Sequence, residues 1–349
     1  MVDRRLRVAF DLSATRLGRA GVARAALSLA DALAQREDLD VVRIGAGPLP
    51  APGTAARRAL VLRTDLAWAP RGARAAARAA AADVLPLPLP RGPLTRGRPP
   101  AVVTVHDLAA LHHPATASRW NRLYTARTLR RVLAAADAVI AVSRDTADDV
   151  EELVPALADR VHVVPNGVDP FWLEPAPPGP ERPPYVLAVG TPEPRKNLPR
   201  LAEAMRLRRE AGAVEELVHV GADGWGDAAL PAEPWIRRLG RVDDAELRGL
   251  YRGAAALAIP SLHEGSGLPV LEAFAAGAPV VAARVGALPE TCAGAAVLVD
   301  PLDIHAIAAG IDAAVARRAE LATLGRAVAE RTTWADAAER VAEVYRSVC

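Results

Sequence analysis

Two glutamates and a glycine-rich loop within residues 264–283, EGSGLPVLEAFAAGAPVVAA, carry the most informative chemistry of the chain. Glu264 and Glu272 lie eight positions apart, and residues 265–267 between them read Gly-Ser-Gly. Pro269 suits the start of a helix because its missing N–H is not needed there, and the pattern predicts a helix over Val270–Ala276. A glycine loop before a helix presents N–H groups to an anion, and Glu272 in the first turn can accept two hydroxyls. Phosphate and diol recognition together indicate a nucleotide or a nucleotide-sugar.

The only lysine of the chain supports the same interpretation. Lys196 stands against 42 arginines, in the run Gly190-Thr-Pro-Glu-Pro-Arg-Lys-Asn197. A compact ammonium is not interchangeable with a planar guanidinium, so a lysine retained in this background suggests a specific task. Arg195 could grip a phosphate with two hydrogen bonds while Lys196 acts as a point charge. The alternative is that the single lysine falls here by chance.

Length, charge and cysteine content limit the class of protein. A chain of 349 residues favours two domains at roughly 150 residues each. A formal net charge of +2 argues against a dedicated nucleic-acid binder. Two cysteines, Cys292 and Cys349, form no disulfide framework, which favours a reducing, cytoplasmic location. We find no secretory segment and no uncharged apolar run of the ~18 residues needed to span a bilayer.

Short apolar runs alternate with alanine-rich stretches of helical period, which predicts an α/β fold with mainly parallel sheets. Residues 169–184, DPFWLEPAPPGPERPP, are too rich in proline to join a sheet and form the expected linker. We therefore expect two doubly wound domains with a cleft between them, and ligands at the carboxyl ends of the strands. The expected strands are Leu6–Leu12, Val41–Gly45, Ala101–Asp107, Ala138–Ser143, Val161–Pro165, Tyr185–Gly190, Glu216–Gly221, Ile236–Gly240, Ala255–Pro260, Pro279–Val285 and Ala296–Asp300.

Arginine is concentrated in the first half of the chain. Residues 51–100 hold nine arginines against Asp65 and Asp83, and residues 86–93, PLPLPRGP, are expected to form a loop. A probable helix follows with further basic and apolar residues, which are Arg119, Trp120, Arg122, Leu123, Tyr124, Arg127, Arg130 and Arg131. Such a face could rest on anionic lipid as a peripheral membrane contact. A solvated helix face in an arginine-rich protein is the alternative.

Several stretches resemble the retaining glycosyltransferases of family 4, which have the two-Rossmann-domain fold called GT-B. The likeness covers nearly the whole chain and is similar in particular to the bacterial mannosyltransferase-type branch that builds surface polysaccharides. The matching stretches are VTVHDLAALHHP at 103–114, ADAVIAVS at 136–143, VVPNGVD at 163–169, VLAVGTPEPRKNL at 186–198, VGADGWG at 220–226, residues 240–290 and AAVLVDP at 295–301. The two spaced glutamates are the most specific of these signals.

The resemblance implies a role for each of several residues on the donor side. Glu272 would hold the ribose hydroxyls of the donor nucleotide, and Glu264 would contact hydroxyls of the transferred sugar. The loop formed by Gly265, Ser266, Gly267 and Leu268 would approach the sugar and the diphosphate with its N–H groups.

Further roles follow from the same resemblance. Arg195 and Lys196 would neutralise the leaving diphosphate, so that neither a metal ion nor another cofactor is expected. His106 would line the sugar pocket near the reacting carbon, although it could also be a plain strand-end histidine. Gly21, in the loop after the first strand, would let the backbone approach the phosphate, and Val242 would lie near the nucleobase.

Some positions depart from the family pattern. Ser266 stands where phenylalanine is usual, His263 replaces a common aromatic residue, and the double-glycine motif of the first loop appears as Ala20-Gly21-Val22. The resemblance implies an acceptor domain over residues 1–168, the linker over 169–184 and a donor domain over 185–331. It also implies a final helix over 332–349 that returns to the first domain.

The leading hypothesis is a metal-independent hexosyltransferase in polysaccharide or glycoconjugate biosynthesis. It would move a hexose, mannose in particular, from a nucleoside-diphosphate sugar to a glycan or polyprenyl-linked acceptor. GDP-mannose is the favoured donor and a UDP-sugar the second choice. A nucleotide-sugar epimerase or hydrolase of the same fold and a non-catalytic nucleotide-sugar-binding protein remain as alternatives. A dehydrogenase is disfavoured, because no Gly-x-Gly-x-x-Gly follows the first strand.

Overall fold

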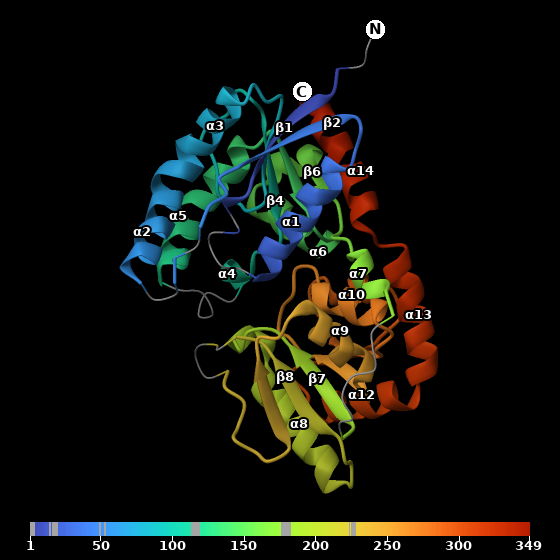
Figure 1. Ribbon diagram of the computed structural model, residues 1–349. Coiled ribbons are helices and arrows are strands. Elements are labelled where there is room, and N and C mark those ends of the chain that lie inside the picture. The colour runs from blue at the N-terminus through green and yellow to red at the C-terminus, as the bar shows by residue number, and fades with distance from the viewer. Residues whose placement is uncertain are drawn as a thin grey trace. The chain divides into compact units, whose positions relative to one another are not determined.

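A computed structural model describes residues 4–13, 15, 20–48, 50–51, 54–112, 119–175, 183–222, 224 and 228–349 (Figure 1). The chain divides into two compact units. The first comprises Met1–Leu111, Ala117–Gly167 and Trp334–Cys349, and the second comprises His112–Thr116 and Val168–Thr333. Parts of three expected features, the linker and the motifs at 103–114 and 220–226, lie outside the described residues.

The first unit is built on parallel strands. β1 (Leu6–Asp11) pairs with β2 (Leu39–Ile44), and a four-stranded sheet has the order β3-β4-β5-β6. A bridge between Val8 and Val84 joins β1 to the start of β3. The four-stranded sheet comprises β3 (Leu85–Leu87), β4 (Ala101–Val105), β5 (Ala138–Ala141) and β6 (Val161–Val163). The expected first-half strands are thus confirmed, with ends shifted by one or two residues.

Residues 86–93 do not form only the expected loop, because Pro86 and Leu87 belong to β3. Leu85 and Leu87 are completely or almost completely buried, and β3 pairs in parallel with Ala101–Val103 of β4. The prolines concealed this strand in the sequence. A three-residue strand that alternates leucine with one proline gains its stability from the two buried leucines.

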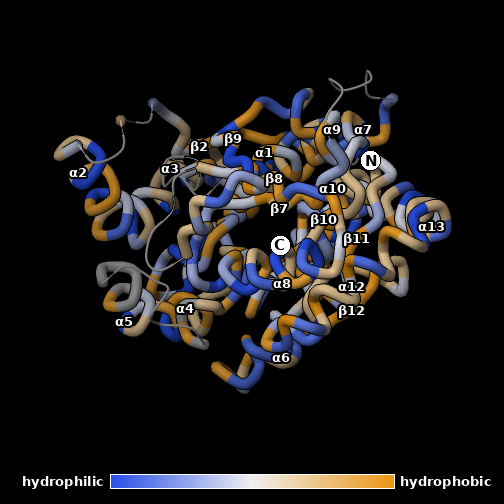
Figure 2. The backbone as a smooth tube through the Cα atoms, turned by 90° about the horizontal axis from the view of Figure 1, so that it is seen from below, coloured by the Kyte–Doolittle hydropathy of each residue, from blue (hydrophilic) through white to orange (hydrophobic). Residues whose placement is uncertain are grey.

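Helices cover this sheet and connect its strands. They are α1 (Ala20–Ala34), α2 (Ala55–Arg63), the π-helix η2 (Thr64–Gly72), α3 (Ala73–Ala79), α4 (Ala109–His112), α5 (Arg119–Ala135), α6 (Arg144–Leu153), the 3-10 helix η4 (Pro155–Arg160) and α14 (Trp334–Ser347). Ser143 caps α6, as its side chain accepts a hydrogen bond from the Thr146 N–H. None of the residues of α2 is buried, and Figure 2 shows hydrophobic and hydrophilic residues along it.

The final helix, α14, belongs to the first unit although the chain reaches it from the second. It packs against α1, and its apolar stripe of Trp334, Ala338, Val341 and Tyr345 is buried. An ion pair between Arg346 and Asp38 adds to this contact. The return of the last helix to the first unit is therefore confirmed.

The second unit contains one six-stranded parallel sheet in the order β12-β11-β10-β7-β8-β9. Its strands are β7 (Tyr185–Val189), β8 (Glu216–Val220), β9 (Ile236–Gly240), β10 (Ala256–Ile259), β11 (Val280–Ala283) and β12 (Val297–Val299). Its helices are α7 (Pro170–Leu173), the 3-10 turn η5 (Pro194–Lys196), α8 (Leu198–Glu210), α9 (Asp244–Gly253), α10 (Leu268–Ala275), α11 (Leu288–Cys292), α12 (Ile304–Ala316) and α13 (Arg318–Glu330).

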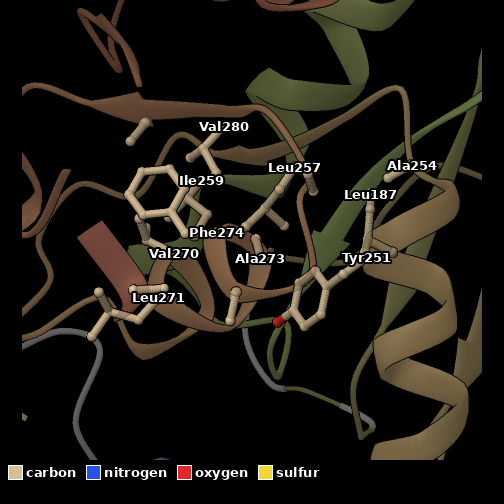
Figure 3. Packing of buried hydrophobic residues seen from close by; sticks show 14 of the residues in the cluster. Leu187, Tyr251, Ala254, Leu257, Ile259, Val270, Leu271, Ala273, Phe274 and Val280 are labelled. Atoms are coloured by element: carbon tan, nitrogen blue, oxygen red, sulfur yellow. The ribbon is translucent and has the colours of Figure 1, made fainter. Parts of the chain in front are cut away.

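Two hydrophobic clusters lie on the two faces of this sheet. One cluster joins strand residues such as Leu187 and Leu257 to α9 and α10, and the other joins Val186 and Ala256 to α8 and α12. Figure 3 shows the first cluster, in which the ring of Phe274 packs among aliphatic side chains. Burial on both faces is the reason why these strands read as continuous apolar runs. The expected α/β architecture, with parallel sheets in two units, is confirmed.

Across the described residues, no helix combines the length and the apolar character that a membrane crossing requires.

Candidate functional site

Two loops of the second unit form the candidate site at the carboxyl ends of adjacent strands. β7 and β10 pair in parallel, so the segments that follow them meet at one edge of the sheet. The segment after β7 contains η5 with Arg195 and Lys196, and the segment after β10 leads through Glu264 to α10. The Leu262 N–H donates to the Arg195 carbonyl at 2.7 Å, which ties the two loops together.

The two cations and the first glutamate of the sequence prediction lie in direct contact. Lys196 Nζ donates to Glu264 Oε1 at 2.6 Å, and Arg195 Nη1 lies 3.1 Å from Glu264 Oε2. Arg195 also donates to the His263 carbonyl at 2.6 Å. The structure therefore brings together the residues that were expected to bind phosphate and sugar.

The charge state of Glu264 follows from these contacts. Its side chain is buried, and burial alone would raise the pKa of its carboxyl group. Lys196 and Arg195 outweigh this effect and lower the pKa from 4.5 to about 2, with help from hydrogen bonds. The Ser261 hydroxyl is one of these donors, at 2.7 Å from Oε1. Glu264 is therefore a carboxylate at neutral pH and can act only as an acceptor.

The backbone around Lys196 is fixed by two unusual residues. Asn197 has a left-handed conformation, with φ at 57°, and its amide donates to the carbonyls of Pro260 and Pro301 at 2.9 and 2.7 Å. Gly190 has φ at 131°, and a Cβ there would lie 3.2 Å from Lys196 Cε. The lysine side chain therefore passes directly over a position that only glycine suits.

The second glutamate, Glu272, is positioned by a tyrosine. α10 begins at Leu268, so Glu272 lies in the second helical turn and not in the first turn that the sequence suggested. The difference arises because Gly267, with φ at 63°, caps a helix that begins two positions before Val270, so that Pro269 takes the second helical position. Tyr251 of α9, which is completely buried, donates its hydroxyl to Glu272 Oε2 at 2.9 Å (Figure 3 shows this ring).

The loop between the glutamates is compact. Gly265 and Gly267 are buried, Ser266 is half-buried, and the Thr291 hydroxyl donates to the Ser266 carbonyl at 2.9 Å. Leu268 stands at the N-terminus of α10, where the first N–H groups have no acceptor within the helix. The positive end of the helix dipole lies at the same place. This loop can therefore offer backbone donors to an anion.

The remaining residues of the sequence prediction lie elsewhere. Val242, in the turn between β9 and α9, is half-buried against the first hydrophobic cluster of the second unit. His106 and Gly21 belong to the first unit. His106 follows β4, and its Nε2 lies 3.1 Å from the Pro88 carbonyl oxygen.

Gly21 does not lie in a loop, as the sequence suggested. It is the second residue of α1 and is exposed, and an added Cβ would contact no described atom within 4 Å. The helix begins at this point because the run from Ala20 is rich in alanine, the best helix former.

Sequence reasoning missed several residues that hold the site in place. The Ser261 hydroxyl donates to Glu264. Arg195 Nη2 donates to Glu193 Oε1 at 2.5 Å. Tyr251 lies 21 positions from Glu272, and no local sequence pattern predicts that these two residues pair. Ser261 and Glu193 could have been noticed as polar residues at strand ends beside the charged residues.

Comparison with known proteins identifies the family. Residues 19–171 match Glycosyltransferase Family 4, and residues 183–317 match Glycosyl transferases group 1. The O-antigen chain mannosyltransferase B of Escherichia coli is 32% identical over 266 residues, which cover 70% of each chain. The alpha-maltose-1-phosphate synthase of Mycolicibacterium smegmatis is 32% identical over 286 residues, covering 71% of this chain and 73% of that protein.

A solved structure gives the same answer for the fold. Anabaena HepE in complex with UDP and glucose superposes with a TM-score of 0.68 at 18% identity, covering 98% of this chain and all of that one. Together with the two parallel-sheet units, the two family matches and the relative that covers 70% of the chain, this shows that the chain belongs to the GT-B glycosyltransferases, with a family 4 segment followed by a group 1 segment.

Proposed function

We propose that this glycosyltransferase moves a hexose, mannose in particular, from a nucleoside-diphosphate sugar to a glycan or polyprenyl-linked acceptor in polysaccharide or glycoconjugate biosynthesis. The contact of Lys196 and Arg195 with Glu264 is the observation that carries the proposal. The relative in E. coli is named as a mannosyltransferase, which supports mannose as the transferred sugar. We propose GDP-mannose as the favoured donor. The HepE structure contains UDP and glucose, so a UDP-sugar is the second choice of donor.

The proposed chemistry depends on the charge that develops when the sugar–phosphate bond breaks. Negative charge grows on the diphosphate and positive charge on the sugar ring. Lys196 and Arg195 would neutralise the diphosphate, while N–H groups of the loop from Gly265 to Leu268 would donate to its oxygens. Fixed cations and dipoles of this kind are the largest catalytic contribution in many enzymes. Because two cations already serve the diphosphate, we propose that the reaction needs no metal ion.

The two glutamates would recognise hydroxyl groups. Glu264, ionised at neutral pH, would accept hydrogen bonds from hydroxyls of the transferred sugar. Lys196 and Arg195 would then contact both Glu264 and the diphosphate of the nucleotide-sugar. Glu272, held by Tyr251, would accept the two ribose hydroxyls. Val242 would lie near the nucleobase.

Two residues of the first unit complete the proposal. His106 would line the sugar pocket near the reacting carbon, with its ring oriented by the Pro88 carbonyl. Gly21 would allow close approach of the backbone of α1 to the phosphate. Transfer would retain the configuration at the reacting carbon, with the leaving phosphate taking the acceptor proton.

We further propose that the first unit makes a peripheral contact with the cytoplasmic face of a membrane. On α5, Arg127, Arg130 and Arg131 are exposed, and Leu123 is 47% exposed. Basic and apolar residues on the exposed side of one helix are suited to an anionic lipid surface. Replacing Arg127 and Arg131 together by glutamine should reduce binding to phosphatidylglycerol vesicles, and unchanged binding would count against this contact.

The donor proposal is tested by thermal stabilisation with GDP, UDP, ADP, TDP and their common sugars, in the presence of a metal chelator. A ligand at 100 times its Kd adds about 2.7 kcal/mol of stability, which is easily measured. We expect one nucleotide to stabilise the protein more than the others without added metal. Absence of a shift from every nucleotide, with folded protein, would contradict the proposal, and a shift that requires metal would contradict metal independence.

A further inference from the structure

The amino ends of the strands of the first unit carry a group of arginines for which the proposed reaction has no use. Two lie on α3, two in the segment before β4 and one at the end of η4, directly before β6. They are Arg74, Arg78, Arg96, Arg98 and Arg160, and we call them the amino-edge arginine cluster.

Backbone carbonyls hold three of these side chains in place. Each of the three guanidinium groups donates to a carbonyl oxygen at 2.7 Å. The pairs are Arg74 with Thr95, Arg78 with Arg98, and Arg160 with Ala136. A carbonyl fixes the orientation of a guanidinium group but does not neutralise its charge, so the cluster keeps its positive charge.

Few carboxylates are available to balance this charge. Asp137 lies among the arginines, and its Oδ2 accepts the Ala101 N–H at 2.8 Å. Asp83 is also near, but it accepts from Arg4 at 2.9 Å and from the Arg7 N–H at 2.8 Å. Among the described residues, Asp137 is the carboxylate whose charge acts on both Arg74 and Arg160.

The charges around Arg160 shift the pKa of its guanidinium in opposite directions. Burial lowers the pKa of its guanidinium, repulsion from Arg96 lowers it further, and attraction to Asp137 opposes both with a smaller effect. Burial also lowers the pKa of Arg74, with Asp137 opposing and Arg78 adding to the decrease. Repulsion from Arg96 therefore outweighs the attraction to Asp137 at Arg160, whereas at Arg74 the attraction to Asp137 is larger than the repulsion from Arg78.

Arg74 points most directly to a missing partner. Only 7% of this residue is exposed, and its Nε and Nη2 atoms are buried without a hydrogen-bond partner among the described residues. Gly97 packs against it, since a Cβ there would lie 3.3 Å from Arg74 Nη1. A buried cation with unsatisfied donors is costly unless an anion compensates it.

We propose that the amino-edge arginine cluster is a second anion-binding site, for a ligand that carries a phosphate or diphosphate group. Planar guanidinium groups match phosphate oxygens with paired hydrogen bonds. The cluster lies at the opposite edge of the sheet from His106, because β4 runs from Ala101 to Val105 between them, about 17 Å. The site is thus distinct from one at the carboxyl ends of these strands. A soluble phosphorylated compound and an anionic lipid headgroup both offer this chemistry.

Calorimetric titration with inorganic pyrophosphate tests the proposal. The background is the Arg195→Ala/Lys196→Ala protein, so that the cations of the second unit do not contribute. We expect binding in this background and a loss of affinity of at least about tenfold in Arg96→Gln/Arg98→Gln, since charge-assisted hydrogen bonds are removed. The side chains of Arg96 and Arg98 are exposed, so their replacement should not disturb folding. The Arg58→Gln/Arg63→Gln pair, at exposed positions of α2, removes the same charge from the same unit and should leave the affinity unchanged.

Vesicle sedimentation distinguishes the two sources of phosphate. If pyrophosphate does not bind, the proposal still predicts binding to phosphatidylglycerol vesicles that Arg96→Gln/Arg98→Gln reduces more than the α2 pair Arg58→Gln/Arg63→Gln does. Arg74→Met gives a second readout, because it should remove anion binding while leaving the protein folded by circular dichroism. The proposal is overturned if neither ligand binds through the cluster, or if both pairs of substitutions weaken binding equally.

Discussion

Replacing Glu264 by glutamine should destabilise the second unit at neutral pH, and the effect should shrink in acid. The carboxylate is buried and lies 2.6 Å from Lys196 and 3.1 Å from Arg195. Burial alone would raise its pKa, but the two cations lower the pKa from 4.5 to about 2. Glutamine has the same size and no charge, so the difference in unfolding free energy between the two proteins isolates the ionisation of Glu264.

The magnitude follows from the two pKa values. A carboxyl group with a depressed pKa contributes stability above its unfolded pKa and loses it as the pH falls through the folded pKa. A decrease from 4.5 to about 2 corresponds to about 3 kcal/mol at pH 7. At pH 3 the unfolded chain is protonated while the folded carboxyl is still mostly ionised, so less than half of this contribution remains.

The assay must follow the second unit by itself, because a two-unit chain need not unfold in one step. We would equilibrate both proteins in urea at pH 7, 5 and 3 and apply a short pulse of hydrogen exchange. Mass spectrometry of peptides from β10 and α10 then reports the unfolding of this unit. Glu203→Gln, at an exposed position of α8, is the matched control and should change stability by less than about 0.5 kcal/mol. A Glu264→Gln effect that is independent of pH, or that grows in acid, would refute the ion-pair assignment.

Further substitutions and one chemical probe test the other parts of the site. Lys196→Ala should lower kcat about 10²-fold or more, the scale of losing one donor to a developing charge, and a full rate at saturating donor would contradict this. Glu272→Ala should raise the donor Kd, and an unchanged Kd would remove its ribose role. Tyr251→Phe keeps the buried ring but loses one hydrogen bond, so the Kd should rise by about two- to tenfold. Burial raises the pKa of Cys292 to about 12, so a thiol reagent at pH 8 should label the exposed Cys349 and should reach Cys292 only in urea.

The alternation of strands and helices could be predicted from the sequence because both faces of each sheet are covered. Such strands read as apolar runs, and the runs from Leu6 to Val299 gave the architecture of both units. β3 was the exception, since Pro86 stands between its two buried leucines. The start of α1 was missed for a different reason. The resemblance places Gly21 in a loop, whereas the alanine-rich run from Ala20 is helical from its first residue.

The site was predicted in its residues but not in its internal contacts. Local spacing led to Glu264, Glu272, Arg195 and Lys196, because a glycine loop before a helix and an isolated lysine are visible in the sequence. Lys196 and Glu264 lie 68 positions apart, and their pairing depends on the adjacency of β7 and β10. The contact of Tyr251 with Glu272 likewise depends on how α9 and α10 pack. Contacts of this kind follow from the fold and leave no pattern in the local sequence.

The central claim is that the loops after β7 and β10 hold the nucleotide-sugar. Hydrogen exchange of the native protein with and without the nucleotide that stabilises it most would test this claim directly. We predict that protection increases in peptides covering residues 190–198 and 260–275, and that Glu272→Ala weakens this protection at a fixed nucleotide concentration. Protection that leaves both segments unchanged, while the nucleotide demonstrably binds, would contradict the account.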